Sequence, residues 1–148
     1  MRKIIILLFL PFYVLFISCE DTNKKYNPPI EVHFTEYSLF EIDCWETNFN
    51  FNEVIIINNN EKLKKYIVCT SEIYPEIDFS KYTLLLAKGG TGNEVDSVDI
   101  VFLQNALKKY TLSVTVYLTA ATRPDIWRIA ILVPKINDNV SITLNVQS

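Results

Sequence analysis

Few side chains in this 148-residue sequence could carry out acid–base or nucleophilic chemistry. His33 is the one histidine, so it is the only candidate for the imidazole base that Ser-His-Asp and Cys-His enzymes place beside a nucleophile. No G-x-S-x-G motif accompanies it, and the loosely alternating residues around it predict an edge strand. We therefore expect His33 to be a solvent-facing or hydrogen-bonded side chain, and we expect no catalytic residue.

The other polar residues give little indication of metal, phosphate or glycosidic chemistry. One histidine without clustered carboxylates predicts no metal site and no cofactor. Paired carboxylates for glycoside hydrolysis stay open because they need only meet in space, although Asp96 and Asp99 fall on opposite faces of one predicted strand. Gly89-Gly90-Thr91-Gly92-Asn93 holds every glycine of the chain but lacks the G-x-x-x-x-G-K-[ST] spacing of phosphate loops. We interpret it as a sharply constrained turn that uses glycine's freedom to adopt positive φ.

The first nineteen residues predict where the protein is located. Arg2 and Lys3 precede the apolar run Ile4–Ile17, which is the order of a secretory signal peptide and is short for a helix that spans a bilayer. Phe16-Ile17-Ser18-Cys19 resembles the lipobox of bacterial lipoproteins. The resemblance implies a signal peptide over 1–18 and a Cys19 whose acyl chains hold the protein at the outer membrane of a Gram-negative bacterium. An uncleaved N-terminal anchor is the alternative.

The two remaining cysteines, Cys44 and Cys69, form a candidate disulfide. Three cysteines are an odd number, and lipidation of Cys19 would leave these two as a pair in an oxidising compartment. Two buried free thiols are the alternative. The spacing matches no zinc or C-x-x-C redox motif.

Charge excludes some partners. Arg2 and Lys3 leave with the signal peptide, so the mature balance is 12 − 17 = −5, which argues against nucleic acid as a partner. No polybasic patch is present, and the membrane contact is therefore assigned to the acyl chains.

The polar stretch 19–29 predicts a flexible tether. Its Glu20 and Asp21 resemble the export signal of surface lipoproteins, which leaves surface and periplasmic locations as alternatives.

The remainder, 30–148, is expected to form one mainly β domain. Asn58 followed by Glu61 resembles a capping box, and we predict one short helix that ends near Cys69. Tyr110–Leu118 alternates cleanly, whereas Val54–Ile57 and Tyr82–Lys88 are continuously apolar and predict strands buried on both faces. Further strands are predicted at Ile30–Phe40, Val95–Gln104, Ile126–Val133 and Val140–Val146. The pattern favours an antiparallel β-sandwich or partly open barrel with the helix packed on it.

A family resemblance begins at Asp78-Phe79-Ser80-Lys81. This lead-in is followed by an apolar strand, a glycine-containing turn, alternating strands, a proline-containing loop and Val133-Pro134-Lys135. The order resembles the C-terminal domain of PrcB, a regulatory subunit of a bacterial surface protease complex, and related small lipoproteins. Asn93-Glu94-Val95 stands where the family often has a second glycine and a tyrosine. The resemblance implies a protein-binding or protease-regulating module.

These observations favour a non-catalytic binding module with a protein partner, such as a protease, as the function. The binding residues are expected in the loops Gly89–Asn93 and Arg123-Pro124-Asp125, because binding residues favour loops on a rigid sheet. A carbohydrate-binding lipoprotein that uses Trp45 as a sugar platform is the second candidate, and an uncharacterised enzyme is the third. Trp127 is expected in the core. The sequence leaves the oligomeric state open.

Overall fold

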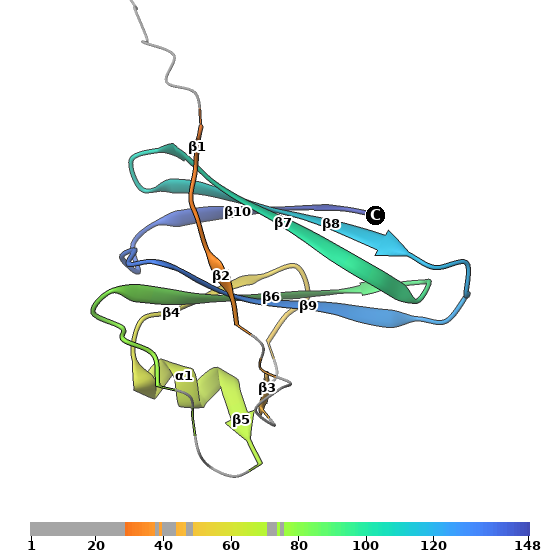
Figure 1. The fold of residues 1–148 in the computed structure, drawn as a ribbon, viewed down its shortest axis with the longest axis horizontal. Helices are drawn as coiled ribbons and strands as arrows, with labels where there is room; N and C mark the ends of the chain where they lie inside the picture. Colours follow the sequence, from red (N-terminus) through yellow and green to blue (C-terminus); the bar gives the residue numbers. More distant parts are fainter. Residues whose placement is uncertain (1–28, 38, 40–43, 47–48, 71–73, 75) are drawn as a thin grey trace, which may run out of the picture.

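The computed structural model describes residues 29–37, 39, 44–46, 49–70, 74 and 76–148. The described elements, in chain order, are β1 (Ile30–Glu31), β2 (Thr35–Glu36), β3 (Cys44–Glu46), β4 (Val54–Ile57), α1 (Asn60–Tyr66), β5 (Ile67–Cys69), β6 (Tyr82–Thr91), β7 (Val95–Ala106), β8 (Lys109–Leu118), β9 (Asp125–Pro134) and β10 (Ser141–Gln147). Sheet A has the order β1-β7-β8-β10, and sheet B has the order β2-β9-β6-β4 (Figure 1). The two sheets face each other, and neither closes into a barrel among the described strands, so the predicted sandwich-like α+β fold is confirmed.

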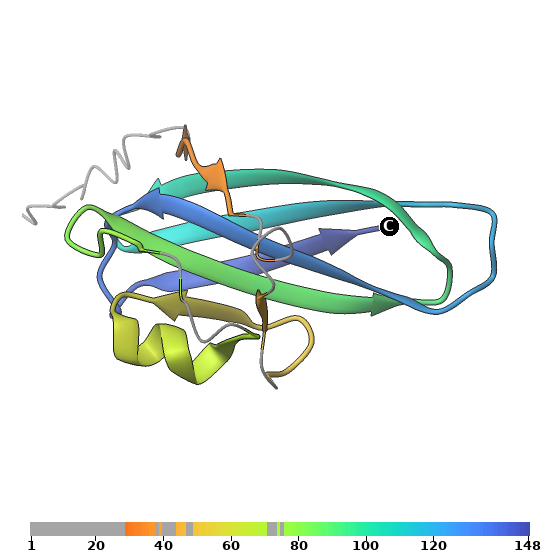
Figure 2. The same cartoon turned by 60° about the horizontal axis from the view of Figure 1, so that its bottom comes forward.

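Sheet B is covered on both faces, and its central strand β6 explains why. Leu84 and Leu86 pack against α1 and the segments around it, whereas Leu85 and Ala87 pack between the sheets. All four side chains are buried, which confirms that the continuous apolar run is a strand with two buried faces. Figures 1 and 2 show α1 on the side of sheet B that faces away from sheet A.

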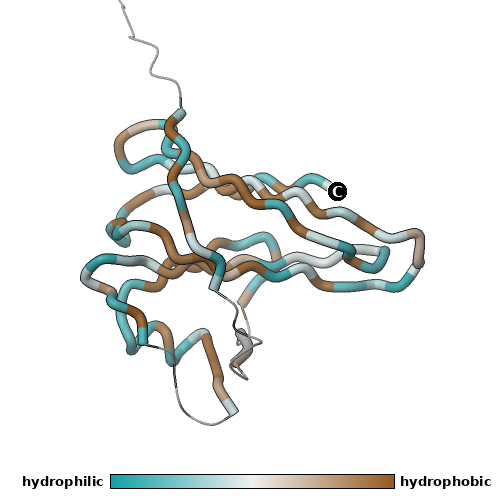
Figure 3. The backbone as a smooth tube through the Cα atoms, viewed as in Figure 1, coloured by the Kyte–Doolittle hydropathy of each residue, from teal (hydrophilic) through white to brown (hydrophobic). Residues whose placement is uncertain are grey.

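Among the described residues, sheet A is covered on one face only. In β8 the side chains of Leu112, Val114 and Val116 are buried between the sheets, whereas the alternating residues Ser113 and Thr115 face outward and are half-buried. The period-2 pattern that predicted this strand is therefore confirmed. In Figure 3, the brown residues of β10 are separated by white or teal ones. β10 pairs with β8 in parallel, while the other strand pairs are antiparallel among those described.

The segment 30–36 does not form the single edge strand that we predicted. β1 pairs with β7 in sheet A, and four residues later β2 pairs with β9 in sheet B (Figure 1). His33 lies between them and is exposed. The chain divides because each sheet offers one free edge on this side, and a strand that crosses from one edge to the other pairs with both. The crossing segment thereby joins the two layers at their margin.

The helix is shorter than predicted and begins one residue later. Asn59, rather than Asn58, is the N-cap, and its side-chain oxygen accepts a hydrogen bond of 2.8 Å from the backbone N–H of Lys62. Because the cap is shifted, Glu61 is not at the third helical position and the predicted capping box is wrong. Asn58 instead links the end of β4 to β6 within sheet B, since its side-chain oxygen accepts a hydrogen bond from the buried Thr83 hydroxyl. Among the described residues, no helix has the length and apolarity needed to cross a membrane.

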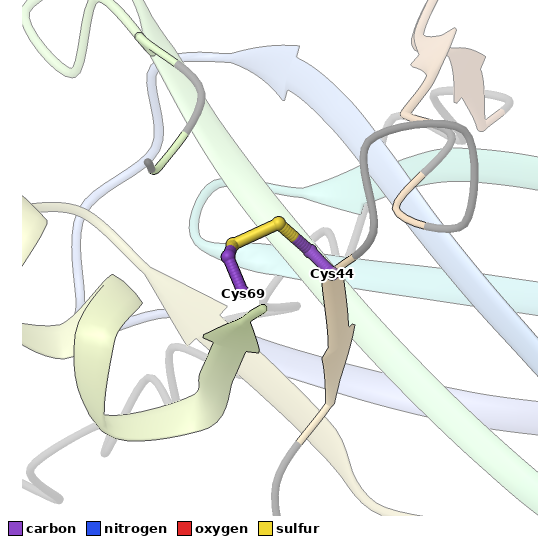
Figure 4. The surroundings of a disulfide bond; sticks show 2 residues. All are labelled: Cys44 and Cys69. Atoms are coloured by element: carbon purple, nitrogen blue, oxygen red, sulfur yellow. A yellow bond between two sulfur atoms is a disulfide. The ribbon is translucent and has the colours of Figure 1, made fainter. Parts of the chain in front are cut away.

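The predicted disulfide is confirmed. Cys44 and Cys69 are directly opposite each other in the small antiparallel sheet of β3 and β5, with 4.0 Å between their Cα atoms (Figure 4). The helix, predicted to end near Cys69, ends at Tyr66, and Cys69 lies in the strand that follows it. Both cysteines belong to the apolar cluster between α1 and sheet B. The bridge closes this outer layer onto the sandwich.

Candidate functional site

Two of the predicted binding segments lie together at one end of the sandwich. The connection between β6 and β7 meets the loop 119–124, which joins β8 to β9 (Figure 1). The backbone N–H of Glu94 donates to the carbonyl of Ala121 at 3.1 Å, and that of Thr119 donates to the carbonyl of Glu94 at 2.9 Å. The side chain of Asn93 adds a bond of 3.3 Å to the carbonyl of Thr119. We call residues 91–95 and 119–125 the loop pair.

Asp125 holds the base of the loop pair. Its carboxylate accepts hydrogen bonds from the backbone N–H of Ile126 at 2.8 Å and of Val95 at 3.1 Å. These two bonds lower the pKa of Asp125 below its ordinary value, and the positive charges of Arg123 and Arg128 act in the same direction. Since Val95 begins β7 in sheet A and Ile126 lies in β9 of sheet B, one carboxylate links the two sheets.

The tip of the loop pair is exposed and carries an ion pair. The guanidinium of Arg123 donates to the carboxylate of Glu94 across the two loops. Ala121, Thr122 and Pro124 are also exposed. An exposed ion pair contributes at most about 1 kcal/mol, so the backbone hydrogen bonds and Asp125 fix the loop shape and leave the tip for contact with other molecules.

The glycines do not form the constrained turn that we predicted. Gly89 and Gly90 lie within β6, and no glycine in the described chain has positive φ; Asn52 and Lys108 adopt that conformation instead. A Cβ atom on Gly89 would lie 2.5 Å from the indole of Trp127, its partner across the strand pair. Glycine is therefore required there by the close approach of a buried ring. Of the predicted segment, Thr91, Gly92 and Asn93 remain at the loop pair.

The loop pair lies far from the point where the described chain begins. Ile30 is paired with Gln104, near the end of β7, while Val95 of the loop pair is the first residue of β7. Nine residues of extended strand, at about 3.3 Å each, separate the two places by roughly 30 Å. Figure 1 shows β1 and the loop pair at opposite ends of the sandwich. A molecule that binds the loop pair therefore lies at the other end of β7 from the first described residues.

Sequence reasoning missed a cavity of about 240 Å³ at the side of the sandwich where β1 crosses to β2. Tyr37 lines it, its hydroxyl is buried with no hydrogen-bond partner among the described residues, and burial raises the pKa of Tyr37 to about 12. The other lining residues described are Glu36, Leu39, Phe49, Leu86, Ala87, Val98, Ile100, Arg128, Ile129 and Ala130. They come from five separate segments of the chain, so no local motif could reveal them.

The remaining candidates are not brought to the loop pair. Cys19 and the signal peptide lie outside the described residues, and of Trp45 only the backbone, in β3, is described. Trp127 is 2% exposed, which confirms it as a core residue. Within the described part of the chain, no group of three His, Cys, Asp or Glu residues is placed to hold a metal ion.

Comparison with known proteins finds no family model, no curated protein and no solved structure that matches this chain. The lipobox and the similarity to the PrcB C-terminal domain therefore rest on the sequence pattern alone.

Proposed function

We propose that this protein is a non-catalytic lipoprotein of the Gram-negative cell envelope that binds a protein partner through the loop pair. The observation that carries the proposal is the placement of the loop pair. It is braced by backbone hydrogen bonds, exposes its tip, and lies roughly 30 Å along β7 from the tether. Binding surfaces are commonly loops held in one shape by a rigid sheet.

The side chains at the tip suit contact with a protein better than chemistry on a small substrate. Asp125 is engaged by two backbone N–H groups, and the carboxylate of Glu94 is held by Arg123. Both carboxylates therefore serve to hold the two loops in one shape. Arginine and exposed prolyl and threonyl groups, by contrast, offer hydrogen bonds and apolar area to a partner surface.

The class of partner follows from the resemblance to a protease-regulating family. A bacterial surface protease is therefore the first partner to test, and a neutral glycan is the second because of Trp45. Acylation of Cys19 would keep the protein at the membrane together with such a partner, since two or three acyl chains bind a bilayer stably.

The proposal is tested with the double variant Arg123→Ala/Pro124→Ala in the full chain. We expect it to fold, because neither side chain is buried, and to lose capture of the envelope protease that the wild type retains. The matched control is Asn137→Ala/Asn139→Ala, which changes two exposed residues in the connection between β9 and β10 and should bind as the wild type does. A glycan array run beside the capture separates the candidates. Sugar binding that is lost on Trp45→Ala would favour the carbohydrate reading instead.

The anchor is tested separately by Cys19→Ala. We expect the wild type to partition with membranes and to carry the added mass of acyl chains, and the variant to lose both properties. A wild-type protein recovered with residues 1–19 intact and unacylated would contradict the assignment to the envelope.

A further inference from the structure

One edge of sheet A has no protecting feature. β10 is the outermost strand, and on its far side no strand follows among the described residues. Its sequence, Ser141 to Gln147, contains no charged residue and no proline. An edge strand of seven residues with free N–H and C=O groups is a template for pairing with another strand.

The other edges of the two sheets are guarded by charge or are short. β1 and β2 are two residues long and carry Glu31 and Glu36. Asp96 and Asp99 lie on the part of β7 beyond its pairing with β1, and Arg128 lies on the corresponding part of β9. β4 has no charge but only four residues. The lack of any guard on β10 is therefore specific to that edge.

We propose that β10 pairs antiparallel with β10 of a second copy of this chain, centred on Leu144. Polar and apolar residues alternate along β10 in the same order in both directions from Leu144. In such a pair Ile142 faces Val146 of the second copy, and Thr143 faces Asn145, so apolar side chains meet on one face and polar ones on the other. A shift of the register by one residue would place apolar side chains opposite polar ones.

Burial in the single chain agrees with this occupant. Val146 is 39% exposed, and Ile142 and Leu144 are half-buried although they point between the sheets. A neighbouring strand would cover the three side chains. Pairing along one edge buries less than the roughly 1,000 Å² of a stable interface, so the dimer is weak in dilute solution. The proposal of this dimer rests on the proposed anchor, because the anchor concentrates the two copies in one membrane.

The anchors do not prevent this arrangement. The joined sheet would run β1-β7-β8-β10 and then the same strands in reverse, which places the two β1 strands at its outer edges. The two chains run in opposite directions, so their tethers enter at opposite ends. Eleven residues, from Cys19 to Pro29, extend to about 36–40 Å, which is long enough for both copies to reach one bilayer.

Cysteine cross-linking of the full chain in its membrane tests the register. In Leu144→Cys the two new thiols are directly opposite, with Cα atoms about 4.5–5.5 Å apart. In Ser141→Cys they are separated by six strand residues, or roughly 20 Å, beyond the about 7 Å limit for a disulfide. We expect the disulfide-linked dimer to be at least about tenfold more abundant for Leu144→Cys. Equal yields from both variants, or no dimer from Leu144→Cys, would overturn the proposal.

A second measurement leaves Leu144 unchanged. Two tagged copies of Thr143→Lys/Asn145→Lys place like charges opposite each other, and we expect their co-purification from one membrane to fall about tenfold. Copies of Thr143→Glu/Asn145→Glu should fail in the same way, and a mixture of the two variants should co-purify at least as well as the wild type. If neither charge pattern changes co-purification, β10 is not the interface. Because these readouts do not involve the loop pair, loss of the dimer and loss of partner binding are distinguishable.

Discussion

Sheet A and sheet B contain four strands each, but they bury their side chains differently. In sheet B, successive residues of β6 such as Leu84 and Leu85 are both fully buried, one against the helix layer and one between the sheets. In sheet A, Leu112 is buried and Ser113 faces outward. Sheet B is thus the middle layer of three, and sheet A is an outer layer.

This difference explains what each sheet can contribute to binding. In the part of the chain that the structure describes, the outward face of sheet A and its β10 edge are open to other molecules, whereas both faces of sheet B serve the core. The loop pair lies where the two sheets are joined by Asp125. It therefore takes its rigidity from the buried layer and its accessibility from the end of the sandwich.

Alanine substitutions at neighbouring positions test the comparison with the largest expected effect. We expect Leu84→Ala and Leu85→Ala each to lower the free energy of unfolding by about 2–5 kcal/mol, because both remove buried side chains. In β8, Leu112→Ala should cost a similar amount, but Ser113→Ala should change stability by no more than about 0.5 kcal/mol. Urea unfolding measures all four. If Leu84→Ala were as mild as Ser113→Ala, the helix layer would not be packed on sheet B.

Removal of the disulfide tests how the third layer is held. The bridge closes a loop across a sequence separation of 25 residues. We expect Cys44→Ala/Cys69→Ala to lower the free energy of unfolding by about 3–4 kcal/mol, mainly because the unfolded chain gains freedom. Hydrogen exchange should then rise in α1 and β5 before it rises in β8. Reduction of the wild-type protein is the control and should reproduce the loss; uniform exchange across both sheets would contradict the layered account.

Two glycine substitutions distinguish the buried part of β6 from the loop pair. Gly89→Ala should cost about 1–3 kcal/mol, because its Cβ would collide with the indole of Trp127 and overpack the core. Gly92→Ala has open space around its Cβ and ordinary φ, so it should be neutral or stabilise by up to about 1 kcal/mol. Unfolding curves followed by tryptophan fluorescence measure both. Equal effects would mean that Trp127 does not lie over Gly89.

Acid titration tests the link that Asp125 makes between the sheets. Its folded pKa lies below the ordinary 3.8, so its ionised form is favoured by folding. The stabilisation is fully present above the unfolded pKa and is lost as the pH falls through the folded pKa. We expect Asp125→Asn to be less stable than the wild type at neutral pH, and the difference to shrink on acidification. A difference that is the same at every pH would show that the charge of Asp125 has no part in the link.

Local patterns in the sequence predicted most of the strands. The prediction failed where contacts between residues distant in the sequence determine the structure. The continuous apolar run of β6 and the alternation of β8 are local, and both were predicted. β3 and β5 were not predicted. Each strand has three residues, and the Cys44–Cys69 bridge holds the two strands in place. Parallel pairing of β10 has the same period-2 pattern as antiparallel pairing, so the pattern could not reveal it.

The sequence selected the two loops of the candidate site but not the contacts that hold them together. Turn composition selected both loops, but their mutual hydrogen bonds join residues that lie 25 to 30 positions apart in the chain. Glu94, which pairs with Arg123, had no local signal at all. The role assigned to Gly89 was wrong because its reason, the ring of Trp127, comes from another strand.

Site-specific photo-cross-linking in intact envelopes tests most directly whether the loop pair is the binding surface. A cross-linking residue at Thr122, which is exposed at the tip, is compared with one at Asn139, which is exposed at the opposite end. We predict one discrete protein adduct from position 122, identified by mass as the envelope protease, and none from position 139. Adducts of the same pattern from both positions, or none from position 122, would contradict the account.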